Sequence, residues 1–218
     1  MIKNFTILGE RNSGTNFLEK AITINFDLPI TWKFGWKHFF GYNDYKDSNE
    51  TLFIAIVRDP VDWLNSMYRT PHHLQEELRT SPENFLTKQF WSYYDGKQHE
   101  KNNGMEIIED RNIYTHERYK NIFECRNVKN KFLLDDMHHK VEHYVLIRYE
   151  DLRDNYDRTL EDICLKYNLP KKHKIYISIK NSTKYGKIFV INKNHIIKDI
   201  NIVDKLDKDL EKRMGYNY

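Results

Sequence analysis

The stretch from Phe5 to Leu18 constrains the fold most, because a short apolar run stops there at a glycine-containing loop and the chain then resumes with helical spacing. Gly9 and Gly14 are separated by four residues. The pattern predicts a strand, an anion-binding loop and a helix. Backbone N–H groups of such a loop and of the first helical turn can converge on an anion at the positive end of the helix dipole. A turn of this kind is also a common structural connector, so the loop alone leaves both interpretations open.

The loop departs from that of the nucleoside triphosphatases. In those proteins a lysine and then a serine or threonine follow the second glycine, whereas Thr15 and Asn16 stand there in this chain. A P-loop nucleotide kinase would also use a magnesium-binding carboxylate after a later strand. The missing lysine makes such a kinase the alternative interpretation of the loop.

The composition indicates one hydrophobic core. With 218 residues, of which 39% are hydrophobic, the chain is expected to form a single domain over residues 1–218. The 35 basic and 32 acidic residues leave a net charge of +3, which argues against a nucleic-acid polymer as partner.

The two cysteines and the lengths of the apolar runs bear on the cellular compartment in which the protein is expected. Cys125 and Cys164 are too few for a disulfide framework and lack metal-ligand spacing, so a reducing environment is expected. We find neither a signal-peptide pattern nor an apolar run long enough to span a bilayer. The sequence therefore predicts a soluble protein, cytoplasmic or otherwise intracellular.

Strand and helix patterns alternate along the chain. Leu52 to Val57 is almost continuously apolar, as in a strand buried on both faces of a parallel sheet, and Asp59 and Pro60 then suit the cap and the first position of a helix. Strands are also expected at 30–34 and 143–149, amphipathic helices at 17–26, 160–167 and 203–214, and a mainly helical, substrate-covering region at about 70–137. This order predicts an α/β fold, an open parallel sheet flanked by helices, with its ligand at the carboxyl ends of the strands.

Three features fall at those strand ends: the loop from Gly9 to Asn16, the Lys37-His38 pair, and Arg58 with Ser66. Together they resemble the sulfotransferase superfamily, whose members use 3′-phosphoadenosine 5′-phosphosulfate (PAPS) as donor and release 3′-phosphoadenosine 5′-phosphate (PAP). The resemblance implies a P-loop-like sulfotransferase fold and the transfer of a sulfuryl group to a hydroxyl or amine acceptor. No metal is expected in that chemistry.

In this family the first loop commonly reads Lys or Arg, Ser, Gly, Thr, Thr and holds the 5′-phosphosulfate. The segment from Ser13 to Asn16 is similar to its core. The basic residue of the family stands immediately before the serine, whereas this chain has Asn12 there and Arg11 one position earlier. Arg11 can replace it only if the backbone accommodates the shift. The donor-binding candidates of this segment are Arg11, Asn12, Ser13, Gly14, Thr15, Asn16 and Phe17.

The second motif of the family is an arginine at the end of a buried strand, followed by Asn or Asp, Pro, a later Asp, and a serine eight residues after the arginine. Arg58, Asp59, Pro60, Asp62 and Ser66 reproduce this pattern. The resemblance implies that Arg58 and Ser66 bind the 3′-phosphate. A guanidinium fork suits a phosphate, and a helical serine can add a hydroxyl donor. The alternatives are a solvated strand-end charge and an ordinary helix serine.

Three further donor contacts follow from the resemblance. Tyr149, within Ile147 to Leu152, is similar to a family tyrosine that lies near the adenine, or it is a partly buried tyrosine at the edge of the sheet. Lys184 and Lys187 stand in a basic, glycine-containing segment that resembles, loosely, the family's nucleotide-covering loop. Both lysines can equally be solvated.

Family members place a His or Glu base between the two nucleotide motifs, often near a lysine. His38, with an unperturbed pKa of about 6.5, is the candidate base, and Lys37 the candidate group that stabilises the departing bridging oxygen. Glu10 is the competing base, or it only orients Arg11. Otherwise His38 is a loop histidine among aromatic residues, and Lys37 points to solvent.

Other interpretations remain open at this stage. The shifted Arg11 is compatible with a non-catalytic nucleotide-binding protein of the same fold. His138, His139 and His143 suggest a surface basic patch rather than a metal cluster. The acceptor is expected to be a hydroxylated molecule, possible classes being glycans, protein tyrosines and small hydroxylated compounds.

Overall fold

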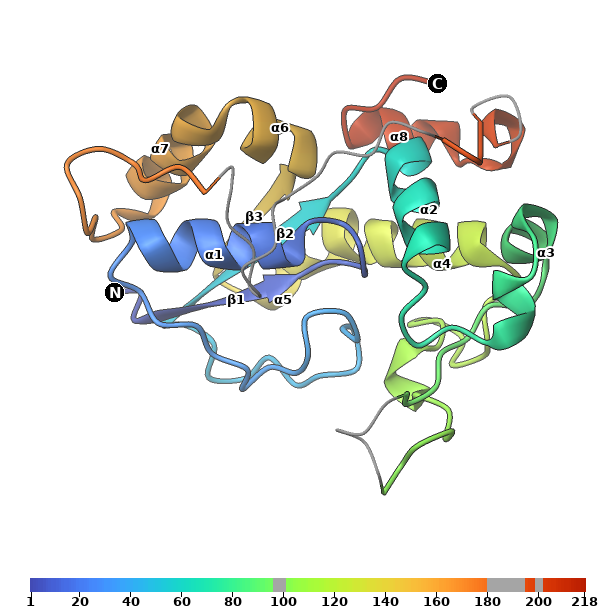
Figure 1. The fold of residues 1–218 in the computed structure, drawn as a ribbon. Helices are drawn as coiled ribbons and strands as arrows, with labels where there is room; N and C mark the ends of the chain where they lie inside the picture. Colours follow the sequence, from blue (N-terminus) through green and yellow to red (C-terminus); the bar gives the residue numbers. More distant parts are fainter. Residues whose placement is uncertain (96–100, 180–194, 199–201) are drawn as a thin grey trace.

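The structure is a computed structural model that describes residues 1–95, 101–179, 195–198 and 202–218. Its centre is a three-stranded sheet of β1 (Asn4–Leu8), β2 (Thr51–Val57) and β3 (His143–Arg148). All strands are parallel and lie in the order β1-β2-β3, with Phe5 beside Leu52 and Leu52 beside His143. The protein is therefore an α/β domain built on a small open parallel sheet flanked by helices, as the alternating pattern predicts (Figure 1).

The two faces of the sheet are read most easily from β2, in which every residue is buried. Leu52, Ile54 and Ile56 pack with α1 (Thr15–Asn25) and α7 (Tyr156–Tyr167). Phe53, Ala55 and Val57 belong to the opposite face, which is covered by the residues around α5 (Met137–Lys140) and by α8 (Lys208–Arg213). Because both faces are covered, the nearly continuous apolar run of β2 has the burial expected of a central parallel strand.

The helix after β2 begins as its sequence predicts. The Asp59 side chain accepts hydrogen bonds from the backbone N–H groups of Val61 and Asp62, both at 3.0 Å, and Pro60 is the first residue of α2 (Pro60–Arg69). These contacts satisfy two of the donors that a helix leaves unpaired at its start. The helix therefore starts directly at the carboxyl end of β2.

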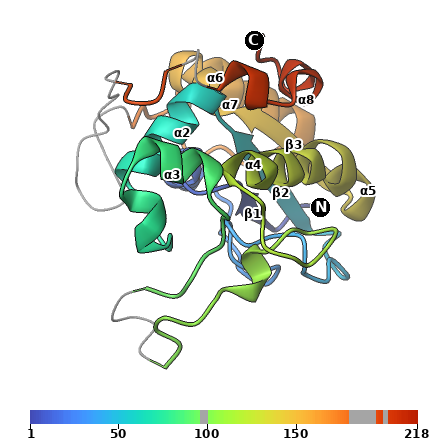
Figure 2. The ribbon, with the colours of Figure 1, turned by 90° about the vertical axis from the view of Figure 1, so that its right-hand side faces the viewer.

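A third hydrophobic cluster lies beyond the end of the sheet. It joins α2 with the 3₁₀ turn η1 (Glu76–Arg79), α3 (Pro82–Thr87) and α4 (Ile122–Lys131), around buried Trp63. Figure 2 shows α2, α3 and α4 side by side at this end of the molecule. The chain continues from α4 through a π-helical turn, η4 (Phe132–Asp136), into α5.

The strand expected at 30–34 is wrong beyond its first residue. Ile30 forms one isolated parallel bridge to Phe5, in which Phe5 N donates to Pro29 O at 3.0 Å and Thr31 N to Phe5 O at 2.8 Å. The chain then turns away, and Gly35 has a φ of 94°. Only a single residue therefore extends the sheet on the β1 side.

Two helical expectations hold only in part. The segment at 203–214 is divided into a 3₁₀ turn, η6 (Val203–Lys205), and α8, because Asp207 caps a new helix by accepting from Leu210 N at 3.0 Å. The region at 70–137 is less helical than expected. Between α3 and α4 the described residues include a short 3₁₀ turn, η3 (Ile108–Asp110), and isolated antiparallel bridges such as Phe90 with Tyr119.

The remaining expected elements are present. The pattern from 143 onward gives β3, and the chain passes at Tyr149 directly into α6 (Tyr149–Asp154) and then α7. Lys184 and Lys187 lie outside the described residues. In the part of the chain that the structure describes, no helix is long and apolar enough to cross a membrane.

Candidate functional site

The loop between β1 and α1 has the backbone form of an anion cradle. Asn12 has a φ of 63°, and Gly14, the residue that caps α1, has a φ of 98°. Among the described residues no side chain caps α1, and its first turn carries no acidic residue. The N–H groups of that turn therefore keep their donor capacity, at the end of the helix that favours an anion.

Gly14 lies against Tyr149. A Cβ atom on Gly14 would stand 2.4 Å from Cδ2 of the tyrosine ring, so only glycine fits there. Tyr149 also meets the ring of Phe17 edge-on, with centroids 6.0 Å apart. The first residue after β3 thus forms one wall of the loop that follows β1.

Arg58 brings the end of β2 to the same place. Its Nη1 atom donates to the carbonyl oxygen of Asn12 at 3.0 Å, and its guanidinium lies 4.8 Å from the centroid of the Tyr149 ring. Its Nε atom is buried, with no hydrogen-bond partner in the described part of the chain. An unpaired buried donor of a cation is unusual. The loop therefore holds the arginine through Nη1, while Nε, among the described residues, stays unpaired and shielded from solvent.

A further cation of this site, Arg153, is not among the residues that the sequence predicts. Its guanidinium lies 5.6 Å from the centroid of the Tyr149 ring and is bonded to Asp154 at 2.7 and 2.6 Å. Burial raises the pKa of the Tyr149 hydroxyl, against the opposing effect of Arg58 and Arg153. The sequence contains a sign of this contact. Arg153 stands four residues after Tyr149 on α6, and side chains with this spacing are neighbours on a helix.

Ser66 lies on the helix that borders the loop. Thr70, the residue that directly follows α2, donates through its hydroxyl to Asn12 Oδ1 at 2.9 Å, and Asn12 Nδ2 donates to Thr70 O at 3.3 Å. Among the described residues no hydrogen bond joins the Ser66 hydroxyl to Arg58. The structure therefore brings Asn12, Arg58 and Tyr149 into contact and leaves Ser66 nearby on α2.

Lys37 and His38 border the loop on its other side. Gly9 N donates to Lys37 O at 2.9 Å, and Nδ1 of His38 lies 2.7 Å from Gly9 O. A carbonyl oxygen only accepts, so Nδ1 carries the proton and Nε2 keeps its lone pair. Burial lowers the pKa of His38 to about 3, with further lowering by Lys37 and Arg11, although the bond to Gly9 and the charge of Glu10 oppose it. The imidazole is therefore neutral at neutral pH, in the tautomer that a base requires.

Lys37 does not point to solvent. Only 2% of this residue is exposed, and its Nζ atom donates to Asn16 Oδ1 at 2.6 Å and to Glu19 Oε2 at 3.0 Å. Asn16 lies in the first turn of α1. An ammonium group thus stands at the start of this helix, although the loop itself has no lysine.

Arg11, the candidate cation for the phosphosulfate, is bonded to groups of the protein. Its guanidinium is buried and donates to Glu10 Oε1 and Asp110 Oδ2 at 2.8 Å, and to Ser92 Oγ and His72 O at 2.9 Å. Four of its five N–H donors are engaged in these bonds. Arg11 therefore joins the loop to the region that follows α2.

Glu10 belongs to the same network. Its Oε2 atom accepts a hydrogen bond from Lys129 of α4, and Lys129 also donates to Asp110 and to His38 O. Burial alone would raise the pKa of Glu10, but Lys129 and Arg11 outweigh it and hold the pKa below its usual range. Since both oxygens are engaged by cations, Glu10 has the geometry of an orienting group for Arg11. Asp110 and Lys129 are not among the site residues that the sequence predicts, because Asp110 is 99 residues from Arg11 and Lys129 is 119 residues from Glu10 in the chain.

Aromatic rings surround the imidazole of His38. Trp36 and Phe39 meet it edge-on, with centroids 6.2 and 6.5 Å away, and Trp32 lies 5.0 Å from Trp36. Trp36 is 45% exposed. The imidazole of His38 therefore lies beside an exposed aromatic ring.

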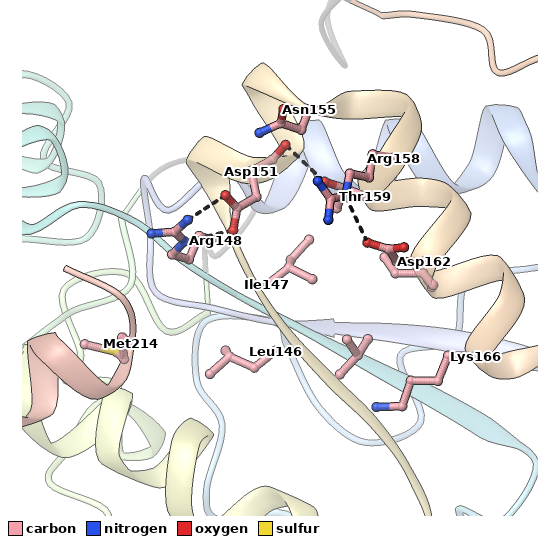
Figure 3. A pocket seen from close by; sticks show the side chains of 12 residues that line it. Leu146, Ile147, Arg148, Asp151, Asn155, Arg158, Thr159, Asp162, Lys166 and Met214 are labelled. Carbon is pink, nitrogen blue, oxygen red and sulfur yellow. Dashed lines mark hydrogen bonds and ion pairs between the residues drawn. The ribbon is translucent and has the colours of Figure 1, made fainter.

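A separate pocket runs along the free edge of β3, with a volume of about 500 Å³. Its polar lining includes Arg148 paired with Asp151 at 2.7 Å and Arg158 near Asp162 (Figure 3). None of the candidate residues named above lines it. Because Arg148 faces this pocket while Tyr149 contacts Gly14, the pocket and the loop site lie on different sides of the chain at this point.

The histidines at 138–143 do not share a helical face, because α5 ends at Lys140 and His143 begins β3. In the described ranges no group of three His, Cys, Asp or Glu side chains is arranged to hold a metal ion.

No protein-family model matches this chain, and none of the curated proteins matches it either.

Proposed function

We propose that this protein is a PAPS-dependent sulfotransferase with a P-loop-like sulfotransferase fold. The observation that carries the proposal is the meeting of three strand ends. The uncapped start of α1, Arg58 with its unpaired Nε atom, and Tyr149 lie in mutual contact, and His38 borders the same loop. A helix terminus and a separate guanidinium suit a donor that carries phosphate groups at two positions.

The 5′-phosphosulfate is assigned to the N–H groups at the start of α1, around Ser13 to Asn16, and the 3′-phosphate to Arg58, with Ser66 as a neighbouring hydroxyl. Tyr149 supplies an aromatic face beside both. Arg11 is assigned no donor contact, since its guanidinium is bonded to Glu10, Asp110, Ser92 and His72.

In the chemical step, Nε2 of His38 accepts the proton of the acceptor hydroxyl while the acceptor oxygen attacks the sulfur atom. The new S–O bond forms as the bond between sulfur and the bridging oxygen breaks, and PAP leaves with the electron pair. The acceptor proton becomes more acidic as the new bond forms, and the lone pair of Nε2, left open by the Nδ1 contact to Gly9 O, is the group that receives it. Lys37, at the first turn of α1, stabilises the charge that develops on the leaving oxygen.

Two alternative functions, a nucleotide kinase and a non-catalytic nucleotide-binding protein, are each supported by one observation. The ammonium group of Lys37 beside Asn16 fits the phosphate-binding lysine of a P-loop nucleotide kinase. The bonds of the Arg11 guanidinium to other protein groups fit a protein that binds nucleotide without turnover. Both predict a ligand preference or an activity different from that of a sulfotransferase.

The proposal is tested by two measurements on the wild-type protein. Calorimetric titration should show PAP binding at least about tenfold more tightly than adenosine 5′-phosphate or ATP, because a charge-assisted contact to the 3′-phosphate contributes about 1.5–3 kcal/mol. Release of PAP from PAPS should then depend on an added hydroxylated acceptor. A preference for ATP would favour the kinase, and PAP binding without acceptor-dependent release would favour the non-catalytic protein.

A further inference from the structure

We propose that Lys129 is a positioning residue that holds the backbone of His38 and the loop residue Glu10 in a fixed relation, so that the imidazole of His38 faces the acceptor. This inference rests on the proposed function for its kinetic consequence. Its structural part, the orientation of the His38 ring, does not depend on that function.

The contacts of Lys129 define this role. Its side chain is 1% exposed, and its Nζ atom donates to Glu10 Oε2, to Asp110 Oδ1 and, at 3.0 Å, to His38 O. An ammonium group has three N–H donors. Each donor of Lys129 therefore has one acceptor, and one of the three belongs to the candidate base.

His38 is consequently held at two points. Its ring donates from Nδ1 to Gly9 O, and its carbonyl oxygen accepts from Lys129. Gly9 directly precedes Glu10, the carboxylate that Lys129 also binds. The imidazole of His38 is thus bonded to Gly9, the next residue Glu10 is bonded to Lys129, and Lys129 is bonded to the backbone carbonyl of His38.

The charges of this buried cluster balance. Glu10 and Asp110 are paired with Arg11 and Lys129, so two carboxylates face two cations. Burial would lower the pKa of Lys129, but Asp110 and Glu10 outweigh it and raise the pKa above its usual value. Removing Lys129 alone would leave an unpaired carboxylate, so stability and positioning would be lost together. A useful variant must remove the hydrogen bond to His38 O without leaving an unpaired buried charge.

The double variant Lys129→Met/Asp110→Asn makes this separation. It removes one cation and one carboxylate, so the cluster stays neutral, and the amide of the new side chain can still accept from Arg11. The hydrogen bond to His38 O is lost. We expect the melting temperature to recover to within about 3 °C of wild type, and the affinity for PAP to stay within about threefold. We expect kcat to remain about 10- to 100-fold below wild type, because a misplaced catalytic group costs about that factor.

Glu211→Gln is the matched control. Glu211 forms another buried ion pair of α4, with Arg126 at 2.5 Å, and among the described residues no hydrogen bond or ion pair joins it to His38. Its loss should lower stability while leaving kcat within about twofold. If the double variant regains both stability and kcat, Lys129 only neutralises charge and the proposal is wrong.

A nuclear magnetic resonance measurement keeps the test independent of sulfuryl transfer. The Nδ1–H signal of His38, assigned by its loss in His38→Gln, should shift or broaden in the double variant and stay unchanged in Glu211→Gln. An unchanged signal in the double variant would overturn the positioning role even if the protein has no transferase activity. If that variant does not fold, Lys129→Met/Glu10→Gln offers the same charge balance, and the same outcomes apply to it.

Discussion

The Nδ1 atom of His38 lies 2.7 Å from the carbonyl oxygen of Gly9, the first residue after β1. This contact fixes the tautomer of the ring and ties it to the start of the loop that caps α1. The same glycine donates its N–H to Lys37 O at 2.9 Å. The candidate base and the anion cradle are therefore parts of one hydrogen-bonded unit.

The first prediction concerns His38. In His38→Ala we expect kcat for sulfuryl transfer to fall about 10²- to 10⁴-fold, the usual contribution of a general base, while PAP still binds with an affinity close to that of wild type. Steady-state kinetics and calorimetry measure the two quantities. His116→Ala, at an exposed histidine, is the control. Turnover equal to that of the control would remove His38 from the mechanism.

The second prediction concerns Arg58. In Arg58→Ala we expect the affinity for PAP to fall about 10- to 100-fold, because a charge-assisted hydrogen bond is worth about 1.5–3 kcal/mol. Adenosine 5′-phosphosulfate, which has no 3′-phosphate, should lose much less. Arg58→Lys should restore only part of the affinity, since an ammonium group lacks the planar fork. Equal losses for both ligands would contradict the assigned 3′-phosphate contact.

Several features of this site follow from the sequence because they depend on neighbouring residues. The apolar run of β2 and the cap at Asp59 are local patterns, and both elements form as expected. Because β2 and β3 are parallel, the residues that follow them, Arg58 and Tyr149, meet at the carboxyl-end edge of the sheet.

The placement of Arg11 could not be predicted in this way. It depends on Asp110, which is 99 residues away in sequence and is buried although no local pattern marks it as a core residue. The strand expected at 30–34 failed for a related reason. Its apolar and aromatic residues pack elsewhere, as Phe34 does against Phe53, and only Ile30 pairs with β1. In both the position of Arg11 and the structure at 30–34, contacts with distant parts of the chain outweighed the local sequence pattern.

The third prediction concerns Gly14. Gly14→Ala should destabilise the protein, since the residue has a φ of 98° and the new Cβ would stand 2.4 Å from the Tyr149 ring. Gly104→Ala is a matched control, because its φ is also positive, 83°, while a Cβ there meets nothing within 4 Å. By urea denaturation we expect Gly14→Ala to cost about 1–3 kcal/mol more than the control, the usual range for overpacking. A similar loss in both variants would show that the Tyr149 contact is unimportant.

The fourth prediction concerns pH. Burial lowers the pKa of His38 to about 3, whereas an unfolded histidine titrates near 6.5. Between those values the unfolded chain binds a proton that folded His38 does not, so the free energy of unfolding decreases as the pH falls. From pH 6 to 5 the slope should be about 1 kcal/mol per pH unit smaller in His38→Gln than in wild type. Equal slopes, measured by urea denaturation, would contradict a buried neutral imidazole.

The most direct test of the proposed sulfotransferase is transfer of a labelled sulfuryl group from PAPS to a panel of glycans, phenols and tyrosine-containing peptides. We expect labelled product and an equal amount of PAP with at least one acceptor class, and at least about 10²-fold less of both with His38→Ala. If wild type and His38→Ala release the same amount of PAP with every acceptor, the assignment of this site to sulfuryl transfer is wrong.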